Sequence, residues 1–321
     1  MLSKLPTKRY NYAIVKIVFP DRIDFDEAAL AKIKSLSIKT YDDTPTDQTV
    51  IIERIRNATI VTVNFIDLPR NTIDAAPDLK YIISSAVGYN TIDYEYAATR
   101  GIKVLNCPTQ NAEAVAEHAL ALMFAVARRI PEASYDLRKG GWHGLDMLGT
   151  ELSHKKLGLV GYGRVGRLIE QKVSGLSMDV RHVDSTASRE ELDNLLSNSD
   201  IICLCLTLNE DTRHLIDKRR LDLIAPHAIL VNVARGALID QSALLKTLMK
   251  GTIRGAGLDV FEDEPASGDV PVDILDLAQL PNVVATPHIA YNTEETIGRL
   301  GEELFRNIDS CLKGSPINVV N

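Results

Sequence analysis

The sequence predicts an α/β fold in which parallel sheets are covered on both faces by helices. Short apolar runs typical of buried strands alternate with segments of helical apolar spacing along the chain. A glycine-rich turn, Gly161-Tyr-Gly-Arg-Val-Gly166, joins one of these strands to a helix. The chain has 321 residues, of which 45% are hydrophobic, so it is long enough to form two domains with separate cores.

The first part of the chain predicts a small α/β domain. Strands are expected at residues 12–19, 37–41, 59–64, 81–85 and 103–106. Helices are expected between them at residues 26–36, 48–57, 71–76 and 93–100. Residues 86–90 form a turn after the fourth strand.

A long apolar segment follows. Residues 111–130 are rich in alanine and leucine and almost without charge after His118, so we expect the longest helix here, ending at Pro131. Such a helix is buried on most sides, between domains or between subunits. Residues 134–150 hold four glycines around Trp142, the only tryptophan, and predict an extended arm or loop.

The second half predicts a doubly wound domain. Strands are expected at residues 157–160, 178–183, 200–206, 228–233, 253–259 and 283–285. Helices are expected at residues 167–173, 188–197, 218–223, 242–250 and 292–312, the second and the last opened by capping-box signatures. We therefore expect a nucleotide-binding domain at residues 106–291. Residues 1–105 and 292–321 form the smaller, discontinuous domain, because the last helix is free to return to it.

The glycine turn has the G-x-G-x-x-G spacing of a Rossmann dinucleotide site. Gly161 permits the tight turn, Gly163 lets a pyrophosphate approach the backbone, and Gly166 lets helix and strand pack closely. The helix start offers free N–H groups to the phosphates. The predicted cofactor-binding loop also includes Tyr162, Arg164 and Val165.

An acidic residue follows the second strand of this domain. The Asp184 carboxylate can accept hydrogen bonds from the adenosine ribose hydroxyls and would repel a 2′-phosphate. We therefore expect NAD as the cofactor, with NADP less favoured.

Polar residues follow three later strands. Arg235, Asp259 with Glu264, and His288 come after the strands at 228–233, 253–259 and 283–285. Ligands of open parallel sheets bind outside the carboxyl ends of the strands, so these side chains point to the edge that holds the glycine turn. Arginine can hold a carboxylate, histidine can exchange a proton with an alcohol, and a carboxylate can fix the ring tautomer. Each residue alone would more often be a surface or loop residue, but together they favour a catalytic site.

Composition excludes several classes of protein. The net charge is −7 and no basic run is present, so no nucleic-acid partner is expected. No apolar run is long enough for a membrane span and no leader is evident, so we expect a cytoplasmic protein. The cysteines have no metal-ligand spacing and no metal site is expected; they are Cys107, Cys203, Cys205 and Cys311.

The segments around Arg235, Glu264 and His288 resemble the signatures of the D-isomer-specific 2-hydroxyacid dehydrogenase family. The similarity extends from about Asp78 to Asn321 and is weaker before Asp78. The resemblance implies that Arg235 binds and orients a 2-oxo acid. It implies that His288 is the acid/base and that Glu264 supports it.

The same resemblance implies further site residues. Asp259 would lie near the nicotinamide carboxamide, and the N–H groups of Val87 and Gly88 would receive the substrate carboxylate. Thr207 stands where the family often has proline and is expected beside the cofactor. The connection at residues 185–187 is shorter than is usual in the family, which leaves the adenosine edge abbreviated.

The family resemblance also implies a fold and an oligomeric state. The resemblance implies a flavodoxin-like substrate domain beside the Rossmann domain, and a homodimer formed through residues 111–150. Trp142 would either reach the substrate site from the partner subunit or anchor the interface.

The family contains several activities. Glutamate rather than glutamine at position 264, no lysine at residues 86–88 and no tyrosine at residues 107–111 disfavour formate, phosphite and D-lactate enzymes. The resemblance therefore favours a reductase of glyoxylate, hydroxypyruvate or a similar 2-oxo acid. The alternatives are a non-catalytic NAD-sensing scaffold and a phosphoglycerate-type dehydrogenase.

Overall fold

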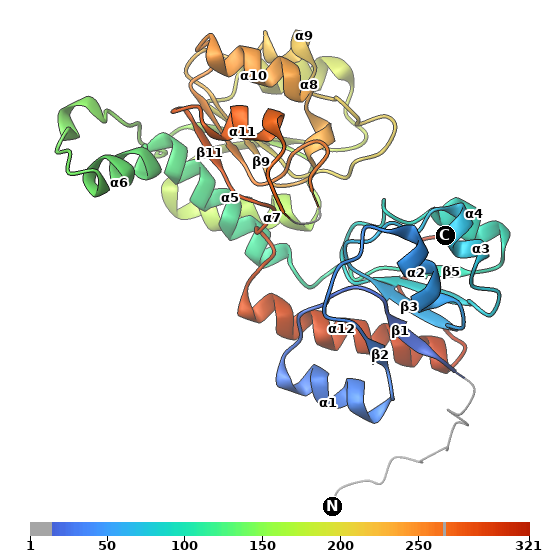
Figure 1. Ribbon diagram of the computed structural model, residues 1–321. Helices are drawn as coiled ribbons and strands as arrows, with labels where there is room; N and C mark the ends of the chain where they lie inside the picture. The colour runs from blue at the N-terminus through green and yellow to red at the C-terminus, as the bar shows by residue number, and fades with distance from the viewer. Residues whose placement is uncertain (1–14, 266–267) are drawn as a thin grey trace, which may run out of the picture. The chain divides into compact units, whose positions relative to one another are not determined.

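A computed structural model describes residues 15–265 and 268–321, so the start of the strand expected at 12–19 lies outside the described residues. The chain divides into two compact units (Figure 1). The first unit runs to Gln110 and includes Glu294–Asn321, and the second unit is Asn111–Thr293.

The first unit contains one parallel sheet with the strand order β2-β1-β3-β4-β5. Its strands are β1 (Ile17–Phe19), β2 (Lys39–Thr40), β3 (Ile60–Val63), β4 (Tyr81–Ser84) and β5 (Lys103–Leu105). This order is that of flavodoxin-like folds, which confirms the fold predicted for the smaller domain.

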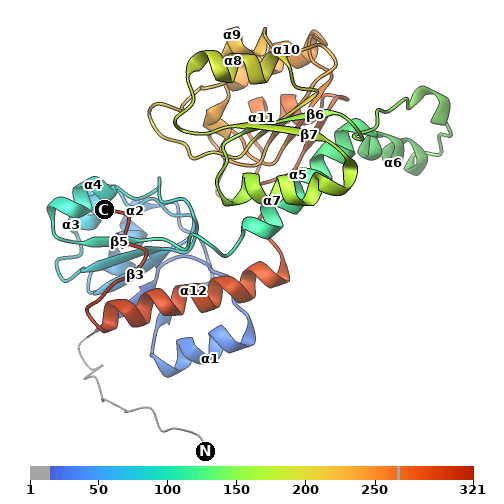
Figure 2. The same cartoon turned by 180° about the vertical axis from the view of Figure 1, so that it is seen from behind.

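Helices cover both faces of this sheet. One face carries α2 (Gln48–Ile55), α3 (Arg70–Asp74) and α4 (Tyr94–Thr99). The other face carries α1 (Glu27–Ser35) and α12 (Glu294–Leu312), which lie side by side in Figures 1 and 2. Side chains of β1 alternate between the two layers, since Ile17 and Phe19 face α1 and α12 whereas Val18 faces α2.

Helix α12 is held by polar contacts as well as by apolar packing. The buried carboxylate of Glu303 accepts hydrogen bonds from the Thr109 N–H at 3.1 Å and the Thr109 hydroxyl at 2.8 Å. The Asn307 side chain donates to the Asn106 carbonyl at 2.8 Å. These bonds fix the end of the chain against the segment that leaves β5.

The second unit contains a six-stranded parallel sheet with the order β11-β10-β9-β8-β6-β7. Its strands are β6 (Lys156–Val160), β7 (Asp179–Val183), β8 (Ile201–Leu204), β9 (Ile229–Asn232), β10 (Gly255–Leu258) and β11 (Val283–Ala285). The chain direction across the sheet reverses between β6 and β8, as in a doubly wound nucleotide-binding fold. Within the described residues β7 is one of the two edge strands, which fits the short connection at residues 185–187.

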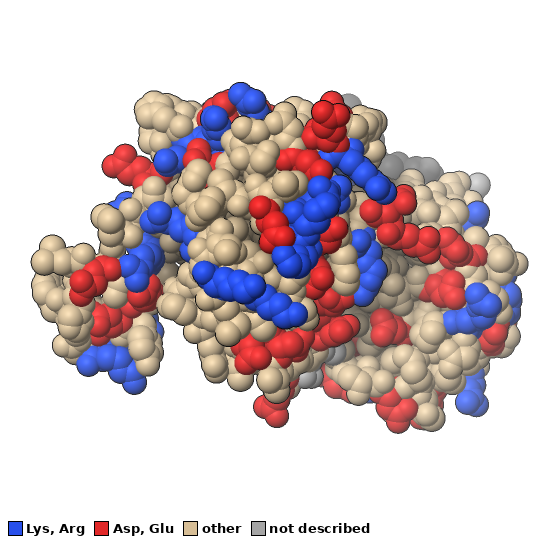
Figure 3. Space-filling model, turned by 90° about the horizontal axis from the view of Figure 1, so that it is seen from above, with Lys and Arg blue, Asp and Glu red and all other residues tan. Residues whose placement is uncertain are grey.

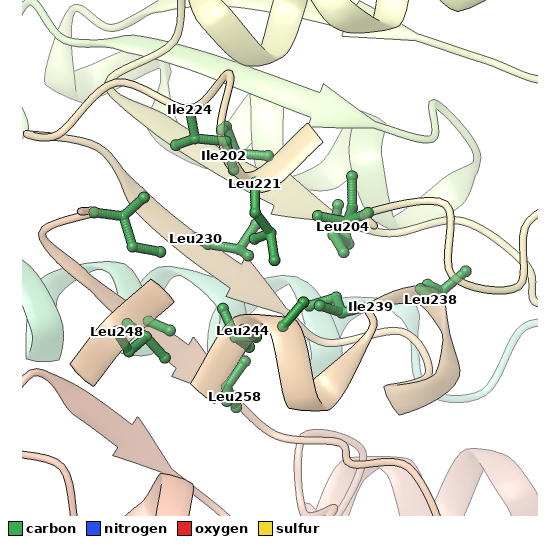
Figure 4. Close-up of a cluster of buried hydrophobic side chains, with 14 of the residues drawn as sticks. Ile202, Leu204, Leu221, Ile224, Leu230, Leu238, Ile239, Leu244, Leu248 and Leu258 are labelled. Atoms are coloured by element: carbon green, nitrogen blue, oxygen red, sulfur yellow. The ribbon is translucent and has the colours of Figure 1, made fainter. Parts of the chain in front are cut away.

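Two helical layers enclose this sheet. Helices α5 (Ala112–Ala127) and α7 (Arg164–Val173) lie on one face, as Figure 2 shows. The other face carries α8 (Arg189–Ser197), α9 (Lys218–Leu221), α10 (Gln241–Met249) and α11 (Val272–Ala278). Between them and the sheet lies a core of leucine and isoleucine side chains, part of which is drawn in Figure 4. The capping box predicted at Ser188 is present in both directions, since Ser188 and Glu191 each bond the other's backbone N–H.

Three expectations were wrong in detail. Helix α5 ends at Ala127, and Pro131 lies in the first turn of a new helix, α6 (Ile130–Arg138), because proline fits that turn without losing a helical hydrogen bond. The expected arm at 134–150 is therefore helical as far as Arg138. The longest helix is α12, with 19 residues against 16 in α5. Helix α11 was not predicted.

Surface charge and helix hydropathy agree with the composition. Lysine and arginine are interspersed with aspartate and glutamate on the face drawn in Figure 3. Among the described residues, no helix combines the length and apolar character needed to cross a membrane.

Replacing Glu303 with alanine is expected to destabilise the first unit by about 3 kcal/mol, because two bonds to a buried carboxylate are lost. Urea unfolding followed by circular dichroism measures this effect. The neighbouring Glu302 is exposed, so Glu302→Ala serves as the matched control and should change the free energy of unfolding by less than about 0.5 kcal/mol. Equal effects of the two variants would contradict this role of Glu303.

Candidate active site

The glycine turn between β6 and α7 gives its three glycines different surroundings. Gly161 has a φ of 103°, and a Cβ there would lie 2.7 Å from the Cys205 carbonyl oxygen. A Cβ at Gly166 would lie 2.6 Å from the Gly161 oxygen, so this position requires close packing. A Cβ at Gly163 would meet nothing within 4 Å. The open space therefore lies where a pyrophosphate is expected to approach the backbone.

The start of α7 faces this space. Gly163 is the N-cap residue and no side chain caps the helix, so the N–H groups of the first turn, which includes Arg164 and Val165, are suited to phosphate oxygens. Tyr162 stacks on His182 of β7 with ring centroids 3.6 Å apart, and its hydroxyl bonds Glu170. These residues fit the diphosphate of a dinucleotide.

Asp184 follows β7 and has a fixed orientation. Its Oδ1 accepts bonds from the Thr186 hydroxyl at 2.7 Å and the Thr186 N–H at 2.8 Å, and these bonds lower the pKa of the Asp184 carboxyl. Within the described residues its Oδ2 accepts no hydrogen bond, so this oxygen is left for an outside donor such as a ribose hydroxyl. Thr207 is exposed after β8, and its carbonyl accepts the Thr212 hydroxyl at 2.9 Å.

His288 and Glu264 form a direct pair. His288 Nδ1 lies 2.5 Å from Glu264 Oε2, while Glu264 Oε1 accepts the Phe261 N–H at 2.7 Å. An ionised carboxylate can only accept, so Nδ1 carries the proton of this bond. The other nitrogen, Nε2, is therefore the atom that can exchange a proton with a substrate.

Asp259 holds the backbone that carries His288. Its buried carboxylate accepts the N–H groups of Ile289 and Ala290, each at 2.9 Å, and its own carbonyl accepts the His288 N–H at 2.8 Å. His288 itself has a left-handed backbone, with a φ of 52°. These contacts keep the strained backbone conformation of His288 in place.

Two residues that the sequence did not indicate complete this network. His118 of α5 lies 3.0 Å from the Thr286 hydroxyl, which donates to Asp259 Oδ1 at 2.6 Å. Burial would raise the pKa of the Asp259 carboxyl, but bonds from His118, Thr286 and two backbone N–H groups outweigh it and lower the pKa. The sequence feature that could have indicated His118 is that it is the single histidine in an otherwise apolar part of α5.

Arg235 follows β9 in a loop shaped by Asn232. The Asn232 side chain donates to the Arg235 carbonyl at 2.9 Å and accepts the Ala234 N–H at 3.1 Å. The Arg235 guanidinium donates to the Ala234 carbonyl at 2.6 Å and forms no ion pair with any described residue. Burial lowers the pKa of Arg235, and the charge of Glu264 opposes that shift. A half-buried cation without a partner carboxylate is suited to an anionic ligand.

Gly236 brings the Arg235 loop against the segment that carries Glu264. A Cβ at Gly236 would lie only 1.8 Å from the Phe261 carbonyl carbon. Because the strands are parallel, the loops after β9, β10 and β11 lie at the same sheet edge as the glycine turn. The second unit thus combines an unpaired arginine, a histidine whose Nε2 can exchange a proton, and a glycine turn with the spacing of a dinucleotide site.

The turn at Val87 and Gly88 belongs to the first unit. Asn106 donates to the Val87 carbonyl and Ser84 donates to the Gly88 carbonyl, both at 2.7 Å. Within the described residues the N–H groups of Val87 and Gly88 have no acceptor. The carbonyls are therefore fixed while two adjacent donors are available.

Trp142 lies on the arm after α6, which extends away from the rest of its unit (Figure 1). Its side chain is 88% exposed. Other large apolar side chains of this region are also exposed: Ile130, Tyr135, Leu137, Leu145 and Leu148.

Comparison with known proteins places this site in a family context. Residues 120–290 match the family described as D-isomer specific 2-hydroxyacid dehydrogenase, NAD binding domain. The glyoxylate reductase of Thermococcus litoralis is 39% identical over 291 residues, which cover 85% of this chain and 86% of that protein. The glycerate dehydrogenase of Methylorubrum extorquens is 34% identical over 314 residues, which cover 95% of this chain and 98% of that protein.

A solved structure is similar over nearly the whole chain. An acyclic imino acid reductase in complex with NADPH and D-Arg superposes with a TM-score of 0.86 and 32% identity, covering 96% of this chain and all of that chain. The two-domain α/β fold is therefore shared with this imino acid reductase.

Replacing Gly236 with alanine is expected to displace the Arg235 loop from Phe261 and to cost at least about 2 kcal/mol of unfolding free energy. Urea unfolding measures the change. A Cβ at Gly175 meets nothing within 4 Å, so Gly175→Ala should leave stability unchanged or slightly raised. A Gly236→Ala protein as stable as the Gly175→Ala protein would refute the close approach.

Proposed function

The chain belongs to the D-isomer specific 2-hydroxyacid dehydrogenase family, and from this premise we propose that it reduces glyoxylate, hydroxypyruvate or a similar small 2-oxo acid with NADH. Family membership makes the chain an NAD(P)-linked oxidoreductase of 2-oxo and 2-hydroxy acids. The substrate, the preference for NAD and the residue roles are the proposal. The observation that carries it is the bond between His288 Nδ1 and Glu264 Oε2.

Each side chain is proposed to have a separate role in the reduction. Arg235 binds the substrate carboxylate and polarises the neighbouring carbonyl, because its guanidinium has no ion-pair partner among the described residues. His288 donates a proton from Nε2 to the carbonyl oxygen, while Glu264 stabilises the charged ring before transfer. The bound nicotinamide supplies the hydride. The N–H groups of Val87 and Gly88 are proposed as further donors to the substrate carboxylate.

The cofactor preference is proposed from Asp184. Thr186 fixes one oxygen of its carboxylate, and the other is free to accept a ribose hydroxyl. A 2′-phosphate would meet the same negative charge. Asp259 is proposed to border the nicotinamide, and Thr207 the adenosine side.

A homodimer through residues 111–150 is proposed from the exposed apolar side chains of α6 and the arm. Exposed groups of this kind mark protein–protein contacts in soluble proteins. Trp142 would be buried in such an interface or reach the partner's substrate site. The cytoplasmic location stays a prediction.

Purified protein is expected to oxidise NADH in the presence of glyoxylate or hydroxypyruvate, and to form the D-alcohol where a stereocentre results. NADH absorbance at 340 nm measures the rate across a panel that includes pyruvate, oxaloacetate and 3-phosphohydroxypyruvate. The rate with NADH should exceed the rate with NADPH, because of Asp184.

Each result has a distinct meaning. No oxidation of either cofactor with any acid of the panel would exclude the proposed reaction and favour a binding role. A rate ratio of NADH to NADPH near one or below would overturn only the cofactor preference. Turnover of 3-phosphohydroxypyruvate alone would favour the phosphoglycerate-type alternative.

The variants His288→Ala and Arg235→Ala are expected to lower kcat/KM at least about 100-fold while NADH still binds. The loss arises because one removes the proton donor and the other removes the carboxylate-binding cation. Intrinsic protein fluorescence quenched by NADH measures binding, and the assay above measures turnover. Arg56→Ala, an exposed arginine of the first unit, is the control. Near-normal turnover of either site variant would disprove its assigned role.

A further inference from the structure

A small cavity lies at the opposite edge of the six-stranded sheet from the candidate active site. It has a volume of about 40 Å³ and is lined by residues at or just before the starts of β6, β8, β9 and β10, together with Thr150 at the end of the arm. In a parallel sheet the amino ends and the carboxyl ends of the strands lie at opposite edges. The cavity is therefore separate from the glycine turn and from His288.

Two cations that line this cavity have no partner. Lys155 and Arg254 are both partly buried, and neither side chain forms a hydrogen bond or an ion pair with any described residue. Among the other described cations of this unit, Lys172 contacts Glu113 and Glu117, and Arg220 contacts Asp193. Arg235 at the candidate active site also forms no ion pair with a described residue. Removing charges from water without a partner is unfavourable, so the unpaired side chains of Lys155 and Arg254 point to an anion that lies outside the chain.

The acidic group in the lining is already engaged. Asp200 Oδ2 accepts the Lys156 N–H at 2.8 Å, and Asp200 Oδ1 lies 2.9 Å from His227 Nε2. Neither oxygen is within 4 Å of the nitrogens of Lys155 or Arg254, since no such ion pair exists. The cavity thus presents two free cations beside one histidine–aspartate pair.

The positions of the two cations suit a compact ligand. Lys155 precedes β6 and Arg254 precedes β10, with β8 and β9 between them, so their backbones are about 14 Å apart at the usual strand spacing. Both long side chains line the same cavity although they start from strands that are not neighbours. A cavity of 40 Å³ accepts a few waters or one small oxyanion.

We propose that this cavity is a binding site for a phosphate group, held by Arg254 and Lys155 at the amino edge of the sheet. The planar guanidinium pairs with two phosphate oxygens, and the lysine ammonium supplies a point charge on the other side. Thr150 lines the same cavity, and its N–H donates to the Ala127 carbonyl at the end of α5 at 2.8 Å. A bound phosphate therefore contacts the segment in which the arm returns to the sheet.

Isothermal titration calorimetry of the full chain with inorganic phosphate, at ionic strength fixed with sodium chloride, tests the proposal. Saturable binding is expected, with a rise in Tm that follows phosphate and not chloride. The double variant Lys155→Ala/Arg254→Ala should weaken phosphate binding at least tenfold. The single variant Arg254→Gln should also weaken phosphate binding. This variant keeps the test valid if the double variant does not fold. Glycerol phosphate, titrated in parallel, distinguishes free phosphate from a phosphate carried on a metabolite.

The control is Arg56→Ala/Lys250→Ala, which removes the same charge at exposed positions. It should bind phosphate as tightly as the unchanged chain. No saturable binding would overturn the proposal. So would equal phosphate affinity in the double variant, which would assign the binding to the glycine turn. The proposal would also be overturned if the chain bound no phosphate and the variants changed only the dissociation of a dimer. That result would indicate that the cavity binds a carboxylate of a second copy of this chain.

Discussion

The buried carboxylate of Asp259 is the constraint on which the candidate active site depends. It lies at the end of β10 and accepts two backbone N–H groups from the loop after β11, and the Thr286 hydroxyl as well. A buried carboxylate is stable only when such donors surround it, so the loop and the charge fix one another. His118 extends this network to α5, which packs on one face of the same sheet.

The rest of the site depends on close backbone approaches. Gly236 lets the Arg235 loop contact Phe261, and Phe261 in turn donates its N–H to Glu264. Glu264 is therefore held on one side by its own loop and on the other by His288. His288, the proposed acid/base, is thus positioned by contacts within the second unit, as preorganised catalysis would require.

The features that the sequence predicted correctly depend on residues that lie close together in the chain. The strands, the glycine turn and the Ser188 capping box rest on neighbouring residues, so pattern and chemistry indicate the same answer. Pro131 was misassigned because proline ends one helix and starts another equally well, and the local pattern does not distinguish them. Helix α11 is only seven residues long, and its apolar pattern is correspondingly weak. Thr286 and His118 are 168 residues apart, so their contact is a product of tertiary structure.

The outer position of β7 has a consequence for the protein in concentrated solution. An edge strand exposes backbone N–H and C=O groups that can pair with a strand of another molecule and start aggregation. Asp179, Arg181 and His182 are exposed along β7, and both signs of charge are present among them. Charged side chains on an edge oppose such pairing, because a second strand would have to bury them. The open edge at β7 is thus compatible with a monodisperse protein because this strand carries charge.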